Sequence, residues 1–138
     1  MNRSDFQKLA NIRIQDAQVL LKTGVNSSGA YYLAGYAVEC ALKACIAKTT
    51  KEGDWPPTQS EVQKMYTHSL KALLDLAISD EELNKSKTNV ALTAHLAVVK
   101  DWSEQKRYEE STQLQAETLI IAITDTKDGV LPWIQQYW

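Results

Sequence analysis

Few residues of this chain could act on a phosphate, because it contains three arginines and two histidines. Together, a histidine and an arginine can carry out acid-base chemistry on a phosphate: the imidazole moves a proton and the guanidinium binds the oxygens. His68 and Arg107 would form such a pair only if the fold brought them together. The sequence has no Gly-rich phosphate loop, no Ser-His-Asp order and no HExxH motif. The plainer interpretation places His68 at the start of a Leu-rich helix that Thr67 or His68 caps, and it leaves catalysis with little support.

Arg107 and Tyr108 form the only arginine-aromatic pair in the sequence, and Lys106 and Trp102 lie close to them. Guanidinium groups bind phosphates with paired hydrogen bonds, and aromatic rings stack on bases. The stretch comes just before the last long helix, where free backbone amides and the positive end of the helix dipole favour an anion. We therefore take these four residues as a candidate ligand-binding surface.

Acidic residues crowd the same stretch and leave a structural alternative open. Glu104, Glu109 and Glu110 nearly cancel its positive charge. Arg107 could then bridge to Glu39 or to another carboxylate inside the protein, since buried or half-buried arginines are usually paired. The favoured hypothesis is this structural bridge.

Glu39 and Lys43 are the only charged residues between Tyr31 and Ile46. Their order and i, i+4 spacing favour an ion pair on one face of a helix, and either charge would be costly if buried alone. A structural pair is the favoured interpretation. A part in ligand binding, together with His68, is the alternative.

Helical periodicity runs through the sequence, and no strand pattern interrupts it. The longest nearly uncharged run, residues 28–48, is apolar almost all round and predicts the central helix of a bundle, with Ser27 or Ser28 as its N-cap. We expect an all-α, mainly up-and-down bundle of about five helices. The principal elements are predicted at residues 5–23, 28–48, 68–78, 88–101 and 112–128.

One long loop and one apolar tail accompany these helices. The consecutive residues Pro56 and Pro57 cannot continue a helix, so a loop is predicted at about residues 49–60. Within this loop, Trp55 is expected to cover the bundle rather than stack on a ligand. The C-terminal tail, residues 130–138, is too apolar for a solvated end and should pack on the bundle or on another subunit.

The composition favours one domain over residues 1–138, because a chain of this length with 44% hydrophobic residues can form one core but hardly two. Its net charge of −2 gives no sign of a general nucleic-acid binder. With no apolar leader and no membrane-spanning run, the protein is expected to be cytoplasmic and to have no membrane partner.

Cys40 and Cys45 lie too far apart on one helix for a disulfide, and they show no metal-ligand spacing with His68 or His95, so buried thiols and no cofactor are expected.

The run AYYLAGYAVECALKACIAK, residues 30–48, closely resembles the first core segment of HEPN domains (higher eukaryotes and prokaryotes nucleotide-binding). Two later segments are similar to further parts of such domains: Thr67-His68-Ser69-Leu70 ahead of a Leu-rich helix, and Trp102 followed by Arg107-Tyr108 ahead of the last long helix. Together these signals cover about residues 5–130. The resemblance implies a helical bundle that forms a homodimer.

HEPN proteins that cleave RNA share an arginine followed four to six residues later by a histidine, and this pair acts near the dimer axis. No arginine of this sequence precedes a histidine at that spacing, and the residues after Arg107 read YEESTQL. The imidazole that would act as general acid or base is missing where the family would place it. The resemblance therefore predicts a member without the ribonuclease motif.

Three classes of function remain. The favoured one is a non-catalytic HEPN-like module, a homodimer that binds a nucleotide, RNA or a protein partner through Arg107 and its neighbours. The second is a ribonuclease with an unorthodox pair of arginine and histidine. The third is a pure interaction protein, for example one half of a toxin-antitoxin or defence pair with a nucleotidyltransferase-like partner, as the resemblance suggests.

Overall fold

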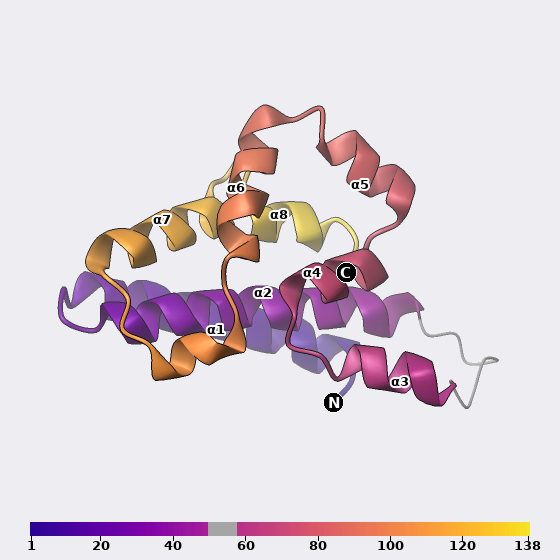
Figure 1. The fold of residues 1–138 in the computed structure, drawn as a ribbon, viewed down its shortest axis with the longest axis horizontal. Helices are drawn as coiled ribbons and strands as arrows, with labels where there is room; N and C mark the ends of the chain where they lie inside the picture. The colour runs from indigo at the N-terminus through magenta and orange to yellow at the C-terminus, as the bar shows by residue number, and fades with distance from the viewer. Residues whose placement is uncertain (50–57) are drawn as a thin grey trace.

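The structure is a computed structural model that describes residues 1–49 and 58–138, so Trp55 lies outside the described residues. Within these ranges the chain forms eight α-helices, one 3-10 helix (η1) and no strand, which confirms the all-α class (Figure 1). In chain order the elements are α1 (Arg3–Lys22), α2 (Ser27–Thr49), α3 (Gln59–Met65), α4 (Leu70–Ala77), α5 (Asp80–Ser86), α6 (Val90–Lys100), η1 (Glu104–Tyr108), α7 (Gln113–Thr124) and α8 (Val130–Gln135).

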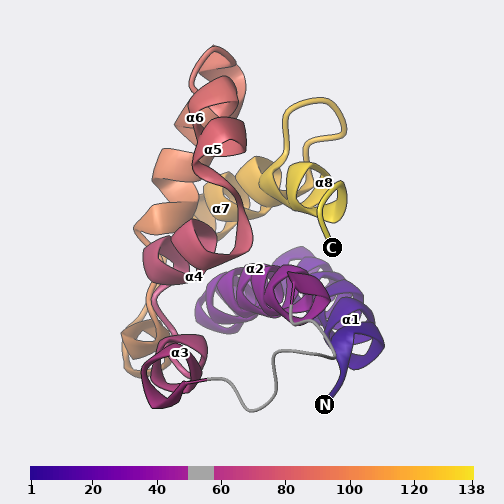
Figure 2. The same ribbon diagram turned by 90° about the vertical axis from the view of Figure 1, so that its right-hand side faces the viewer.

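Helix α2 is the centre of the structure, as predicted. It pairs with α1 over most of its length and also contacts α4, α7, α8 and η1. Figure 2 looks almost along α2 and shows α1 on one side of it and α4 and α8 on others. Because α2 is apolar on nearly every side, packing elements all round it removes the most apolar surface from water.

The predicted bundle is found only in part. Its five principal elements correspond to α1, α2, α4, α6 and α7, and the structure adds the short helices α3, α5 and α8. In Figure 1, α6 runs steeply to α1 and α2 instead of beside them, and it packs against α7, α8 and α4. A regular up-and-down arrangement is therefore not confirmed.

The last long helix is shorter than predicted, since α7 ends at Thr124 rather than at residue 128. The carboxylate of Asp125 accepts hydrogen bonds from the backbone amides of Lys127 (2.9 Å) and Asp128 (2.7 Å). These bonds also lower the pKa of Asp125. The side chain thus engages the amides that a further helical turn would need, which ends the helix.

The two serines predicted to cap α2 hold the start of α7 instead. The hydroxyl of Ser27 donates to the carbonyl oxygen of Ser111 (2.6 Å), and the hydroxyl of Ser28 accepts from the backbone amide of Ser111 (2.8 Å). These bonds tie the residue just before α7 to the first turn of α2. The cap prediction was wrong, because α2 already begins at Ser27 and both hydroxyls bond to Ser111.

The C-terminal tail packs on its own chain, which confirms one of the two predicted alternatives. Val130 and Ile134 of α8 are fully buried, and Trp133 is 9% exposed. The hydroxyl of Tyr137 donates to a carboxylate oxygen of Glu82 on α5 (2.9 Å). The tail therefore exposes less aromatic surface than its sequence suggests.

None of the helices in the described ranges has both the length and the apolar content that crossing a bilayer requires.

Trp102 connects the core to η1, which begins two residues later. Its side chain is 2% exposed and lies flat on α2 over Gly35, where an added Cβ would overlap three atoms of the indole. Tyr32, one turn earlier on α2, packs beside it with ring centroids 5.8 Å apart. Gly35 is therefore required for the close approach that places η1 on α2.

We expect Gly35→Ala to destabilise the protein, because the methyl group must displace the buried Trp102 at a cost of about 1–3 kcal/mol. Alanine returns about 1 kcal/mol in a helix interior, so the net loss should reach about 2 kcal/mol. Urea unfolding followed by circular dichroism measures the change. Gly29→Ala is the matched control, since its Cβ would meet only the flexible end of Leu20 at 3.3 Å. Equal stabilities of the two variants would show that Trp102 is not seated on Gly35.

Candidate functional site

One side of α2 carries two tyrosines and the only two charged residues in the middle of the helix. Tyr32, Tyr36, Glu39 and Lys43 recur every three or four residues and so lie along one side of the helix. The 3-10 helix η1 and the segment between α3 and α4 cover this side. The site is built where these three parts of the chain meet.

The predicted ion pair of Glu39 and Lys43 is confirmed. The Nζ of Lys43 lies 2.9 Å from Oε1 of Glu39. The Glu39 side chain is only 3% exposed and that of Lys43 18% exposed. A carboxylate buried to this extent must be paired and hydrogen-bonded to remain ionised.

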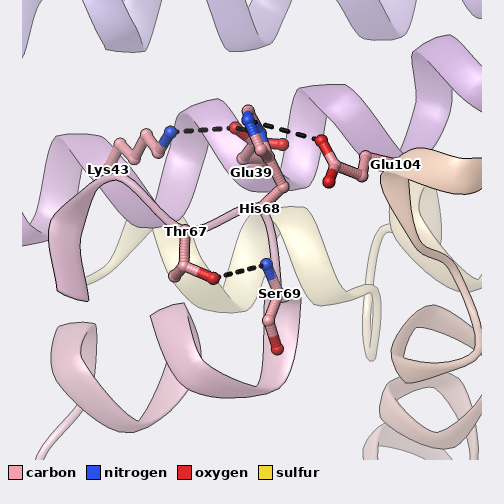
Figure 3. Close-up of polar contacts among 6 residues, drawn as sticks. All are labelled: Glu39, Lys43, Thr67, His68, Ser69 and Glu104. Carbon is pink, nitrogen blue, oxygen red and sulfur yellow. Dashed lines mark hydrogen bonds and ion pairs between the residues drawn. The ribbon is translucent and has the colours of Figure 1, made fainter. Parts of the chain in front are cut away.

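His68 supplies the second partner of Glu39. Its Nδ1 lies 2.9 Å from the same Oε1 of Glu39, and its Nε2 lies 3.4 Å from Oε2 of Glu104 on η1 (Figure 3). The His68 side chain is 47% exposed. One imidazole thus stands between a buried carboxylate of α2 and a half-buried carboxylate of η1.

The local sequence explains why His68 is free to do this. Ser69, rather than Thr67 or His68, is the N-cap of α4, and its hydroxyl accepts from the backbone amide of Ala72 (3.3 Å). The Thr67 hydroxyl accepts from the backbone amide of Ser69 (3.1 Å). The expectation that Thr67 or His68 caps the helix was therefore wrong. With the cap supplied by Ser69, the imidazole turns back toward α2.

The cluster of Glu39, Lys43, His68 and Glu104 is poorly suited to cleave RNA. A general acid or base acting on a phosphate needs a free ring nitrogen, whereas the exposed Nε2 of His68 faces the carboxylate of Glu104. This carboxylate also repels an approaching phosphate. The fold places His68 against η1, which carries Arg107, but no contact joins the two side chains among the described residues.

Among the described residues, Arg107 has no carboxylate partner that would form the predicted structural bridge. It is exposed, and no carboxylate of the described residues lies within ion-pair distance of it. Its guanidinium carbon lies 4.8 Å from the ring centroid of Tyr108, whose side chain is itself 74% exposed. Arg107 and Tyr108 therefore form a cation-π stack at the surface.

The other two predicted surface residues have different roles. Lys106 donates to Glu109 (2.6 Å), and this hydrogen bond raises the pKa of Lys106. Trp102 is buried over Gly35 and offers no ring face to a ligand. The predicted site residues thus separate into a buried polar cluster around Glu39, a supporting indole, and the exposed stack of Arg107 and Tyr108.

The structure adds three residues to the site that the sequence did not single out, Glu104, Tyr32 and Tyr36. Glu104 had been noted only as a charge that weakens the local field. Tyr32 and Tyr36 stack with ring centroids 6.3 Å apart and planes 5° from parallel. Their i, i+4 spacing was the available signal for this stack, whereas nothing in the sequence pairs Glu104 with His68.

Metal binding finds no support in the described part of the chain, where no three side chains of His, Cys, Asp or Glu gather around a common point. Cys40 and Cys45 are buried free thiols, as predicted. Burial, followed for Cys40 by the charge of Glu39, raises the pKa of each thiol to about 11.

Comparisons with protein-family models, with curated proteins and with solved structures found no match to this chain. The HEPN resemblance therefore remains a prediction based on the sequence segments that suggested it.

Lys43→Met should destabilise the protein by an amount near the lower end of about 3–5 kcal/mol, the usual cost of breaking a buried ion pair. The loss is reduced because Glu39 keeps His68 as a partner. Urea unfolding measures it, and adding Glu39→Gln to Lys43→Met should restore most of the stability.

Lys71→Met is the matched control, because Lys71 forms the same i, i+4 type of pair with Asp75 (3.1 Å) while remaining 73% exposed. Its removal should change stability by less than about 1 kcal/mol. If the two lysine variants lose the same free energy of unfolding, the burial of Glu39 does not make its ion pair more stabilising than an exposed one.

Stability should decrease between about pH 8.5 and pH 11, because unfolded thiols ionise near pH 8.5 while the buried thiols keep their protons. The contribution is complete below the unfolded pKa and is lost as pH rises toward the folded value of about 11. Urea unfolding at several alkaline pH values tests this. In parallel, iodoacetamide should label Cys40 and Cys45 only after unfolding, and rapid labelling of the native protein would contradict the burial.

Proposed function

We propose that this chain is a non-catalytic HEPN-like binding module that takes single-stranded RNA or a nucleotide on the outer face of η1. The observation that carries the proposal is the exposed stack of Arg107 on Tyr108, in which the guanidinium has no carboxylate partner among the described residues. An arginine that is neither buried nor paired is available to a ligand.

The chemistry of this stack suits a nucleotide. The guanidinium can donate paired hydrogen bonds to a phosphate, and the exposed ring of Tyr108 can stack on a base. Trp102, two residues before η1, fixes this part of the chain to α2 through its packing on Gly35. Because Glu109 already neutralises Lys106, Arg107 is the one positive charge of η1 that can bind a phosphate. We therefore expect a modest, salt-sensitive affinity for RNA.

A ribonuclease is the second candidate, and one observation favours it. Glu39 holds the imidazole of His68 through Nδ1, as the carboxylate of a catalytic triad holds its histidine. The carboxylate of Glu104 next to Nε2 argues against it. We therefore rank RNA binding without cleavage first.

The dimer implied by the HEPN resemblance belongs to the same proposal. Apolar side chains on α1 and α7 remain exposed, among them Val19 (64%), Leu114 (72%) and Ile121 (59%), and they would suit such an interface. A nucleotidyltransferase-like partner in a toxin-antitoxin or defence pair is the remaining alternative.

Arg107→Ala and Tyr108→Ala should each weaken the binding of a labelled single-stranded RNA by about 1–3 kcal/mol, the range for losing a base-stacking side chain. Fluorescence anisotropy measures this. Because both side chains are exposed, the free energy of unfolding should change by less than about 0.5 kcal/mol.

Lys127→Ala is the control, since it removes one exposed positive charge from the turn between α7 and α8. This variant should bind RNA as the parent does. A loss of affinity equal to that of Arg107→Ala would show that RNA binds by nonspecific attraction to positive charge. The RNA should be recovered at full length. Shortened RNA that disappears with His68→Ala would establish the ribonuclease instead.

A further inference from the structure

We propose that His68 is a proton-dependent positioning residue. In its doubly protonated form it bridges Glu39 of α2 and Glu104 of η1, and so holds the stack of Arg107 and Tyr108 in its binding arrangement. The ligand-binding consequence rests on the function proposed above, whereas the bridge itself does not.

The two ends of the bridge differ in how firmly they are held. Glu39 is 3% exposed and is also bound by Lys43, so it is a fixed anchor within α2. Glu104 is 33% exposed and belongs to a helix of five residues, none of which is buried. A change in the ion-pair contact between His68 and Glu104 will therefore move η1 rather than α2.

Few other polar contacts hold η1. Before it, Trp102 is seated on Gly35; after it, Ser111 is tied to Ser27 and Ser28. Between these points, the contact of His68 with Glu104 is the only ion pair or hydrogen bond from an η1 side chain to another element in the described part of the chain. Among the described residues, His68 is therefore the polar contact that fixes the middle of η1, which carries Arg107, on its packing surface against α2.

The protonation state of the imidazole decides whether both carboxylates are satisfied. An imidazolium can donate from both ring nitrogens, whereas a neutral ring donates from one and presents a lone pair at the other. With Nδ1 donating to Glu39, the neutral ring turns the Nε2 lone pair toward the carboxylate of Glu104. Repulsion then replaces attraction.

Three charged groups act on this ring in the described structure. Glu39 and Lys43 come from α2 and Glu104 from η1. On the side of α4, Lys71 is paired with Asp75 and makes no contact with His68. Two carboxylates and one ammonium group thus set the field in which His68 gains or loses its proton.

The bridge makes ligand affinity depend on pH. When a rise in pH removes the second proton of His68, η1 should be released and RNA affinity should fall, and affinities measured at several values between about pH 5 and pH 8 test this. We expect a decrease of at least about fivefold, the lower end of typical coupling between two sites.

Glu104→Gln separates this mechanism from a simple charge effect. The amide of the new side chain can donate to Nε2 of neutral His68 and can accept from Nε2-H of the imidazolium, so the bridge should survive at every pH. RNA binding by this variant, measured by fluorescence anisotropy, should keep the parent's low-pH affinity across the range. His95→Gln is the histidine control and should keep the parent's pH profile, because His95 contacts the carbonyl oxygen of Asp128 (2.8 Å), not η1.

A parent-like pH dependence in Glu104→Gln would overturn the proposal, because it would show that the charge of His68 acts directly on the ligand. If RNA binds at no pH, the proposed function fails, and amide hydrogen exchange of ligand-free η1 tests the bridge alone. Corrected for the intrinsic effect of pH, protection in η1 should fall with rising pH in the parent and stay constant in Glu104→Gln. Protection that is constant in both proteins would refute the bridge.

Discussion

The burial of one carboxylate, that of Glu39, constrains the polar part of this structure. A charge at 3% exposure inside an otherwise apolar helix needs partners, and α2 itself supplies only Lys43. The second partner comes from the segment before α4, and its ring also reaches η1. One ionised group therefore brings together three parts of the chain that are distant in sequence. This requirement also leaves the exposed end of the imidazole beside the helix that carries the proposed binding surface.

The elements determined by local pattern were predicted well. The all-α class, the central position of residues 28–48 and the pairing of Glu39 with Lys43 follow from helical periodicity and from a spacing within one helix. The predictions were wrong where neighbouring residues could play the same structural role. Ser69 competed with Thr67 and His68 for the cap of α4, and the side chain of Asp125 ended a helix that periodicity alone would extend.

Most members of the candidate site were predicted, whereas the part played by Glu104 and the arrangement of the site were not. Arg107 was expected to reach a buried carboxylate, yet that carboxylate is taken by Lys43 and His68, and the guanidinium lies over Tyr108 instead. Glu39, His68 and Glu104 are separated by 29 and 36 residues (68 − 39 and 104 − 68). Contacts at such separations depend on how the helices pack, and periodicity contains no information about them.

The seat of Trp102 on Gly35 also limits how this sequence can diverge. Any side chain at position 35 occupies the space of the indole, so a larger residue there is tolerated only if position 102 becomes smaller. The two positions should therefore change together among descendants of this chain, although 67 residues (102 − 35) separate them. A protein that loses both residues also loses the packing that fixes the chain to α2 just before η1. The charged residues of η1 would then be less constrained in sequence.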